Sequence, residues 1–218
     1  MSGLRAPDPV LAERGPRRSR PRTQEKLANL LSVAAALIAR RGYEQTAIRD
    51  VGRATGASLP GMYYYFKSKG DLLFQIQHRA FSSLLEAQER EFAVEEPPER
   101  KFRRLIVGHL AFYARHPNEM KVCTFELESV RDEAYREIEE LRRRYYRLLA
   151  SVVGELLKKA GREDPRRLAS RHITLFVFGM LNWTLMWYDP QRDGPVENLG
   201  DEMADLVLPG LSSRKEVR

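Results

Sequence analysis

Apolar residues recur along this chain at intervals of three and four, which is the spacing of one face of a helix, and no segment shows convincing strand alternation. The first such segment is expected to begin at Thr23, which can cap a helix, and to stop at Gly42. Its apolar stripe consists of Leu27, Leu30, Leu31, Ala34, Ala35 and Ile38. The pattern predicts an all-α protein.

A longer helix is predicted from about Lys69 to Phe92, before Pro97-Pro98 breaks the chain. Its apolar stripe consists of Leu72, Leu73, Ile76, Ala80 and Leu84. Further helical patterns follow near residues 99–115, 118–129, 132–160, 165–188 and 197–208. Gly161 ends one of them, and Asp164-Pro165 supplies the cap and first position of the next.

Two short helices separated by a tight turn are predicted between the first segment and the long helix. Thr46 can cap the first of them, whose apolar face carries Ile48, Val51 and Ala54, and Gly56 ends it. Ser58 can cap the second, which runs from Leu59 to about Tyr65 with Pro60 in its first turn. This order is typical of a helix-turn-helix that places its second helix in a DNA groove.

The second short helix has a packed side and an outward side. Met62 and Phe66, four residues apart, are expected to pack on the first helix. The positions that then face outward are Leu59, Gly61, Tyr64 and Tyr65. Lys69 begins the next helix, where its ammonium and nearby backbone N–H groups can hold a phosphate together.

This part of the chain resembles the TetR family of bacterial transcriptional regulators, closely over roughly residues 25 to 75. The residues that carry the likeness are Gly42-Tyr43, Thr46, Gly56-Ala57-Ser58, Met62-Tyr63-Tyr64, Phe66 and Ser68-Lys69-Gly70-Asp71-Leu72-Leu73. The resemblance implies a flexible basic arm over 1–22, a three-helix helix-turn-helix domain over 23–73, and a ligand-binding and dimerisation domain over 74–218.

The resemblance also implies which residues touch DNA. Backbone contacts would come from Thr46, Ser58, Tyr63, Tyr64 and Lys69, and base contacts from Leu59, Gly61 and Tyr65. Pro60, Leu59 and Tyr65 depart from residues often found in the family, so the operator sequence is not given by analogy.

Positive charge is concentrated at the N-terminal end. Residues 1–73 contain thirteen lysines and arginines against six acidic residues, and the whole chain is also +7, so the other residues are neutral in sum. Attraction to phosphates explains this asymmetry. Two alternatives would explain the charge as well. One is a solvated basic tail, since residues 14–23 are rich in proline and arginine, and the other is a nonspecific basic DNA-associated structural protein. Neither alternative accounts for the large neutral helical half.

Several other classes of protein find no support. No apolar window is long enough to cross a membrane and no secretory leader is recognised, so a cytoplasmic location is expected. A single cysteine, Cys123, excludes an internal disulfide framework. His109, His116 and Glu126 lack metal-ligand spacing, and no phosphate-binding loop or nucleophile motif is present. We therefore expect neither catalysis nor a metal or cofactor.

The helix predicted over 165–188 is apolar nearly all round, so more than one of its faces must be covered. The chain also ends in an amphipathic helix with Leu199, Met203, Leu206, Val207 and Leu211. In the TetR family two such helices form a four-helix interface, which implies a homodimer through 165–188 and 197–211 and a near-palindromic operator with half-sites about 35 Å apart. The plain alternative is the core of a monomer.

Aromatic residues gather in the second half, either as ordinary core or as the wall of a ligand site with Asn182, Thr184, Glu126 and Arg142 as polar groups. The segments 109–130, 142–146 and 179–194 resemble the TetR subgroup that senses acyl-CoA and related CoA thioesters. The expected ligand residues are Phe112, Tyr113, Phe125, Arg142, Tyr145, Trp183 and Trp187.

The nucleotide end of a CoA thioester needs arginine or lysine. Arg103, Arg104 and Arg143 are also candidates, but glutamates at helical spacing favour salt bridges for most of these arginines, so Arg142 is preferred. The competing effector is a lipophilic cation, as in efflux regulators of the family, for which Glu126 and Glu128 would serve. In either case the expected mechanism is a ligand-induced shift of the helix beginning near Lys69 that releases a repressor from DNA.

Overall fold

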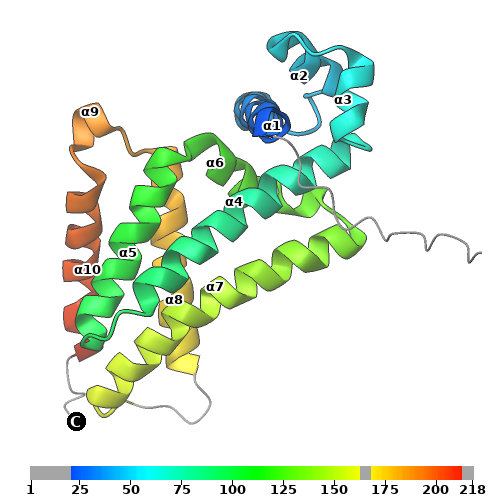
Figure 1. The fold of residues 1–218 in the computed structure, drawn as a ribbon. Helices are drawn as coiled ribbons and strands as arrows, with labels where there is room; N and C mark the ends of the chain where they lie inside the picture. The colour runs from blue at the N-terminus through cyan, green and yellow to red at the C-terminus, as the bar shows by residue number, and fades with distance from the viewer. Residues whose placement is uncertain (1–20, 163–167, 213–218) are drawn as a thin grey trace, which may run out of the picture.

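The computed structural model describes residues 21–162 and 168–212, and within these ranges the chain forms helices and no strand. Figure 1 shows a three-helix head from which one long helix runs into a larger helical body. The elements are α1 Pro21–Arg41, α2 Ile48–Thr55, α3 Leu59–Tyr65, α4 Lys69–Phe92, α5 Pro98–Arg115, α6 Pro117–Phe125, η1 Leu127–Ser129, α7 Asp132–Lys159, α8 Leu168–Trp183, η2 Thr184–Met186, α9 Pro190–Asp193 and α10 Val196–Ser212. The predicted all-α class is confirmed.

The head is built from α1, α2, α3 and the first turns of α4 around one apolar core, which also takes in Val122 of α6 and Val130. Met62 and Phe66 are fully buried in it, as their spacing predicted. Gly56 ends α2 at φ +70°, a left-handed conformation that costs glycine little. A Cβ on Gly52 would lie 2.9 Å from the Ala57 carbonyl oxygen, so the close packing of this turn also requires glycine.

Two predicted caps in the head are wrong. α1 already includes Pro21 and Arg22, so Thr23 lies inside the helix and does not cap it. α2 is capped from Ala47, whose N–H donates to Asp50 Oδ2 at 3.0 Å. Thr46 instead lies buried with its hydroxyl donating to the Gly42 carbonyl at 2.9 Å. The hydroxyl therefore ties Thr46 back to the loop after α1 rather than forward to α2.

The body follows the predicted helices with three differences. The segment expected as one helix over 118–129 is α6 followed by the single turn η1. The segment expected over 165–188 is helical to Trp183 and then tightens into η2, while the cap at Asp164-Pro165 lies outside the described residues. The short helix α9, which no pattern predicted, joins η2 to α10.

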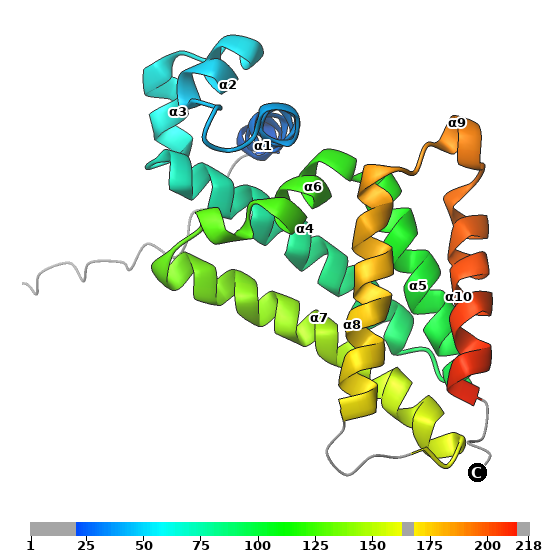
Figure 2. The ribbon, with the colours of Figure 1, turned by 180° about the vertical axis from the view of Figure 1, so that it is seen from behind.

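Helix α5 lies at the centre of the far end of the body, with α8 and α10 running alongside it (Figure 2). Gly200 of α10 permits the close approach, because a Cβ there would meet Val107 of α5 at 2.8 Å. Within the part of the chain that the structure describes, no helix is both long and apolar enough to span a membrane.

Large apolar side chains remain on the outer faces of α8 and α10. Phe176 is 69% exposed and Leu206 is 74% exposed, although both belong to helices whose inner faces fill the main core. Exposed apolar residues of this size are typical of a surface that another chain covers.

Candidate functional site

Helix α3 presents its outward residues from a firmly capped first turn. Ser58 Oγ accepts the Gly61 N–H at 3.2 Å, so the predicted cap is confirmed. Tyr63 and Tyr64 are more than half exposed and Leu59 nearly so, because Met62 alone anchors the helix inward within this turn. A seven-residue helix with exposed phenol groups at 54% and 77% is well placed to donate hydrogen bonds to phosphates.

Two residues expected at the DNA surface are less available than the resemblance implied. Tyr65 is half-buried, with its ring edge-on to Tyr64 at 5.0 Å between centroids and tilted against Phe66. Thr46 is 3% exposed. The packing of the head thus uses both of these side chains, which the resemblance assigns to DNA contacts.

Lys69 lies at the N-terminus of α4 beside the loop after α1. Its Nζ is 4.1 Å from the centroid of the Tyr43 ring and 3.7 Å from Glu44 Oε2. Ser68 caps the helix by accepting the Asp71 N–H at 3.1 Å. The Lys69 side chain is 30% exposed. Its ammonium also donates to the Glu44 carbonyl at 3.3 Å, and a phosphate would compete with these contacts for the ammonium.

A cavity of about 410 Å³ lies within the body, far along the chain from α3. Its walls come from α4, α5, α6, α7 and α8. The lining residues are Phe81, His109, Tyr113, Thr124, Glu139, Arg142, Arg143, Tyr145, Tyr146, Leu175, Phe178, Gly179 and Asn182. The structure therefore brings Tyr113, Arg142 and Tyr145 of the expected set together.

Two hydrogen-bonded pairs cross this cavity wall. The Tyr113 hydroxyl donates to Asn182 Oδ1 at 3.0 Å, and the Tyr145 hydroxyl lies 2.6 Å from His109 Nδ1. Burial raises the pKa of both tyrosines and lowers the pKa of His109 to about 3. All these groups are consequently neutral near pH 7, so this part of the wall offers dipoles, while the charged side chains of the wall are Glu139, Arg142 and Arg143.

Arg142 differs from the other candidate arginines in its partners. Its Nη1 donates to the Cys123 carbonyl at 3.4 Å, and its guanidinium lies 5.4 Å from the centroid of Phe81. Among the described residues it has no carboxylate within ion-pair distance, whereas the other three arginines do. Those ion pairs are Arg103 with Asp201 and Asp205, Arg104 with Glu96 and Glu91, and Arg143 with Glu139.

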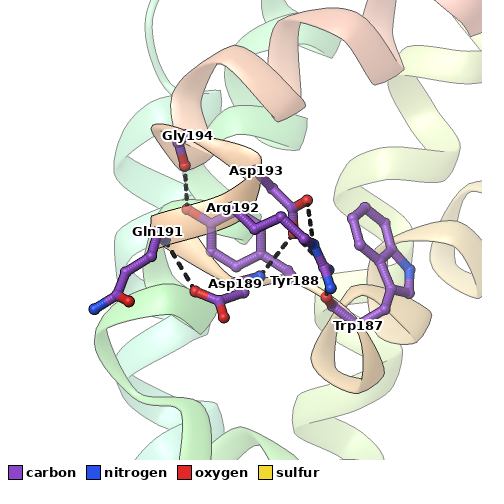
Figure 3. Close-up of polar contacts among 7 residues, drawn as sticks. All are labelled: Trp187, Tyr188, Asp189, Gln191, Arg192, Asp193 and Gly194. Atoms are coloured by element: carbon purple, nitrogen blue, oxygen red, sulfur yellow. Dashed lines mark hydrogen bonds and ion pairs between the residues drawn. The ribbon is translucent and has the colours of Figure 1, made fainter.

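Both tryptophans, which were expected to contact the ligand, lie outside the lining of this cavity. Trp183, the last residue of α8, is 61% exposed, and Trp187, which follows η2, is 41% exposed. Figure 3 shows Trp187 at the edge of a polar connector, where Arg192 donates to its carbonyl and pairs with Asp193 at 2.9 Å. The connector also contains the bonds from Gln191 N–H to Asp189 and from the Tyr188 hydroxyl to the Gly194 carbonyl.

Phe112 and Phe125 are also absent from this cavity. Phe112 is buried against His116, 4.5 Å between ring centroids, on another side of α5. Phe125 is half exposed at the end of α6. Residues that the sequence reasoning missed include His109 and Phe178. The signal that could have found them is helical spacing. His109 lies four residues before Tyr113, and Phe178 lies four residues before Asn182, so each shares a helix face with a residue of the expected site.

Glu126 lies between the head and the body rather than in the cavity. Its Oε1 accepts the Tyr43 N–H at 3.0 Å, its Oε2 accepts the Ser129 hydroxyl at 3.2 Å, and its carbonyl accepts from Gln77 of α4 at 3.0 Å. Thr124, two residues earlier, lines the cavity. The end of α6 therefore touches both the cavity and the loop that leads into α2.

Two family models together match most of the chain. The model for the N-terminal domain of bacterial regulatory proteins of the TetR family matches residues 30–76, and the model described as tetracyclin repressor-like, C-terminal domain, matches residues 95–211. A curated relative, the fatty acid metabolism regulator protein of Bacillus subtilis (strain 168), is 22% identical over 190 residues, which are 87% of this chain and 97% of the relative.

Solved structures show the same fold. The TetR family regulator PfmR from Thermus thermophilus has a TM-score of 0.72 and 26% identity, covering 83% of this chain and 97% of its own. AibR in complex with isovaleryl coenzyme A and operator DNA has a TM-score of 0.75 and 21% identity, and the match covers 84% of this chain and 98% of the AibR chain. With its helix-turn-helix head and matched C-terminal domain, the chain belongs to the TetR family of bacterial transcriptional regulators.

Proposed function

We propose that this protein is a repressor that binds a near-palindromic operator as a homodimer and is released by an acyl-CoA or another CoA thioester. The observation that carries the ligand class is Arg142, an arginine without a carboxylate partner among the described residues, in the wall of an aromatic cavity. The relatives named above that act on fatty acid metabolism or bind isovaleryl coenzyme A support the same class.

The cavity suits the two halves of such a ligand. Its volume of about 410 Å³ is within the range of small-molecule sites and is enough for an acyl group, not for the nucleotide. Phe81, Tyr146 and Phe178 provide an apolar enclosure for the acyl group. Arg142 provides a planar fork of donors for the phosphates that remain outside, with Arg143 beside it.

The proposed DNA contacts come from α3 and the start of α4. Leu59, Gly61 and Tyr64 face outward, Tyr63 and Lys69 flank them, and Ser58 keeps a hydroxyl proton to donate while its oxygen caps the helix. We leave out Thr46 and give Tyr65 a supporting role, because both are used in the packing of the head.

The proposed dimer uses the exposed faces of α8 and α10. Phe176, Trp183 and Leu206 stay 61–74% exposed in a single chain, which is unfavourable for side chains of this size. A two-fold axis through these faces would cover them and would set two α3 helices at a fixed separation, as a palindrome requires.

Release needs a connection from the cavity to the head. α6 provides one, since Thr124 lines the cavity and Glu126 holds the Tyr43 N–H at 3.0 Å. α4 provides the other, since it carries Phe81 in the cavity wall and Lys69 at the head. A ligand that prefers the released geometry by a few kcal/mol would lower operator affinity by that amount.

The alternative effector, a lipophilic cation, was supported by Glu126 and Glu128, and Glu128 is exposed and does not line the cavity. Glu126 is used between head and body, and Glu139, the carboxylate in the cavity wall, pairs with Arg143 at 2.8 Å. A nonspecific basic structural protein likewise does not account for the cavity or for the match over 95–211.

The test is fluorescence anisotropy with DNA from upstream of the protein's own coding region, titrated with salt and with medium-chain, long-chain and aromatic CoA thioesters. Tight binding that one thioester abolishes is the expected result. Tight binding that no thioester changes would reject the ligand class, and binding no tighter than to random DNA would reject the operator.

A further inference from the structure

Three buried side-chain atoms in the described part of the chain lack a hydrogen-bond partner: Gln77 Oε1, Gln88 Oε1 and His109 Nε2. Of these three residues only His109 lines the cavity. The imidazole is 1% exposed, with its ring 3.9 Å from the Tyr113 ring between centroids. A buried polar atom without a partner costs about 1–3 kcal/mol, so its retention in a ligand-sized cavity calls for an explanation.

The partner of the other ring nitrogen determines what Nε2 can do. Nδ1 lies 2.6 Å from the Tyr145 hydroxyl, and burial lowers the pKa of His109 to about 3, so the ring is neutral with one proton. A phenol is a stronger acid than a neutral imidazole N–H, and the imidazole nitrogen is the better acceptor. The Tyr145 hydroxyl therefore donates to Nδ1, and Nε2 carries the proton as an unused donor.

We propose that His109 Nε2–H binds a carbonyl oxygen in the acyl part of the effector and thereby selects ligands that carry a carbonyl at this depth. The inference rests on the proposed effector class and deepens it. A carbonyl is an acceptor without charge, which fits a wall whose Tyr113, Tyr145 and Asn182 are all neutral. The oxygen belongs either to the thioester itself or to a keto group on the acyl chain.

The structure gives this donor a fixed direction. Tyr113 and Tyr145 contact the imidazole ring, and Phe178 lies 6.3 Å from it between centroids. A site whose buried donor is held in this way rejects an analogue without the acceptor, because the donor then stays unpaired in the complex. Loss of one such bond costs about 1–3 kcal/mol, or roughly 5- to 150-fold in affinity.

The experiment compares ligand pairs that differ by one carbonyl oxygen: octanoyl-CoA with S-octyl-CoA, and the matching octanoyl and octyl derivatives of N-acetylcysteamine, which lack the nucleotide. Calorimetry gives each dissociation constant for the wild type and for His109→Phe, which keeps a ring but has no donor. Two variants are the controls. His109→Gln keeps a donor, and His116→Phe changes an exposed histidine that does not line the cavity.

The wild type and His116→Phe are expected to prefer the carbonyl member of each pair by at least 5-fold, His109→Phe by less than twofold, and His109→Gln by an intermediate amount. A further gain for 3-oxooctanoyl-CoA that His109→Phe loses would assign the contact to a chain keto group instead of the thioester. A folded His109→Phe protein that keeps the wild-type preference would overturn the proposal.

The two ligand series separate this proposal from the proposed function. The first outcome is that the N-acetylcysteamine pair shows the His109-dependent preference but the CoA ligands bind no more tightly than their N-acetylcysteamine counterparts. That result would retain the His109 contact and reject CoA recognition. Tight binding of octanoyl-CoA, S-octyl-CoA and 3-oxooctanoyl-CoA without any preference would retain CoA recognition and reject the His109 contact. Absence of binding by all of these ligands would overturn both.

Discussion

Replacement of Glu126 by alanine tests whether the end of α6 transmits the state of the cavity to the DNA-binding head. The change removes the acceptor of the Tyr43 N–H at 3.0 Å and of the Ser129 hydroxyl at 3.2 Å. A hydrogen bond to a charged acceptor is worth about 1.5–3 kcal/mol when buried. Because this site is half-buried and water can replace part of the bond, we expect a loss of about 1–2 kcal/mol.

That loss should appear in the coupling between ligand and DNA. The assay is operator affinity by anisotropy, measured without ligand and with a saturating amount of the CoA thioester that binds most tightly in the panel. The ratio of the two dissociation constants should fall by roughly 5- to 30-fold in Glu126→Ala, as a 1–2 kcal/mol change requires. Urea unfolding measures how much of the effect is general destabilisation.

Glu128→Ala is the matched control, because this neighbouring glutamate is exposed and does not line the cavity. It should leave the ratio unchanged. Glu126→Gln keeps a carbonyl oxygen as acceptor and should lie between the two. The reasoning is refuted if Glu126→Ala folds, binds both ligand and operator, and keeps the wild-type ratio.

Four further predictions address the other parts of the site. Lys69→Ala should weaken binding to all DNA sequences and reduce the slope of log affinity against log salt by roughly one unit, and an unchanged slope would remove Lys69 from the contacts. Arg142→Ala should weaken the binding of octanoyl-CoA by roughly 10-fold or more and that of octanoyl-N-acetylcysteamine by less, as measured by calorimetry. Equal losses of affinity for the two ligands would place the nucleotide elsewhere. Phe176→Asp should raise the dimer dissociation constant, measured by ultracentrifugation, by roughly 100-fold or more. Burial of one phenylalanine is worth about 1.5–3 kcal/mol, and a two-fold interface contains Phe176 from both subunits. A variant that dimerises as tightly as the wild type would exclude this face. Below pH 6.5, the ordinary pKa of histidine, His109 is protonated in the unfolded chain, but in the folded chain its pKa of about 3 keeps it neutral. The free energy of unfolding therefore falls as the pH decreases from 7. This group alone should cost about 2 kcal/mol between pH 7 and pH 5, and urea unfolding of His109→Phe should lack that part of the loss.

Local signals in the sequence determined most helix boundaries. The Ser58 cap, the turn at Gly56 and the span of α4 from Lys69 to Phe92 follow from side chains that bond to their own backbone or from residues that alone permit a left-handed turn. The same local pattern in the head carried the resemblance to the family. Thr46 shows the limit of this reasoning, since its hydroxyl donates to the Gly42 carbonyl in the loop after α1 and does not cap α2.

Which side chains form the cavity was decided by the tertiary structure. Phe178 and Trp183 are both aromatic residues of α8, yet the first lines the cavity and the second is 61% exposed, because a helix that is apolar all round does not show which face its neighbours cover. Arg142 and Arg143 are adjacent in α7. The ion pair of Arg143 with Glu139 lies within that helix at a spacing of four and follows from the sequence, whereas the ring of Phe81 beside Arg142 comes from α4 and depends on the packing of the two helices.

His109 makes the same point for the ligand. In the sequence it is a lone histidine without metal-ligand spacing. Its capacity to donate depends on the Tyr145 hydroxyl, which comes from another helix 36 residues away, and on burial that keeps the ring neutral. Helix formation depends on near neighbours in the chain, whereas a binding site depends on contacts between distant segments, and these exist only once the helices have packed.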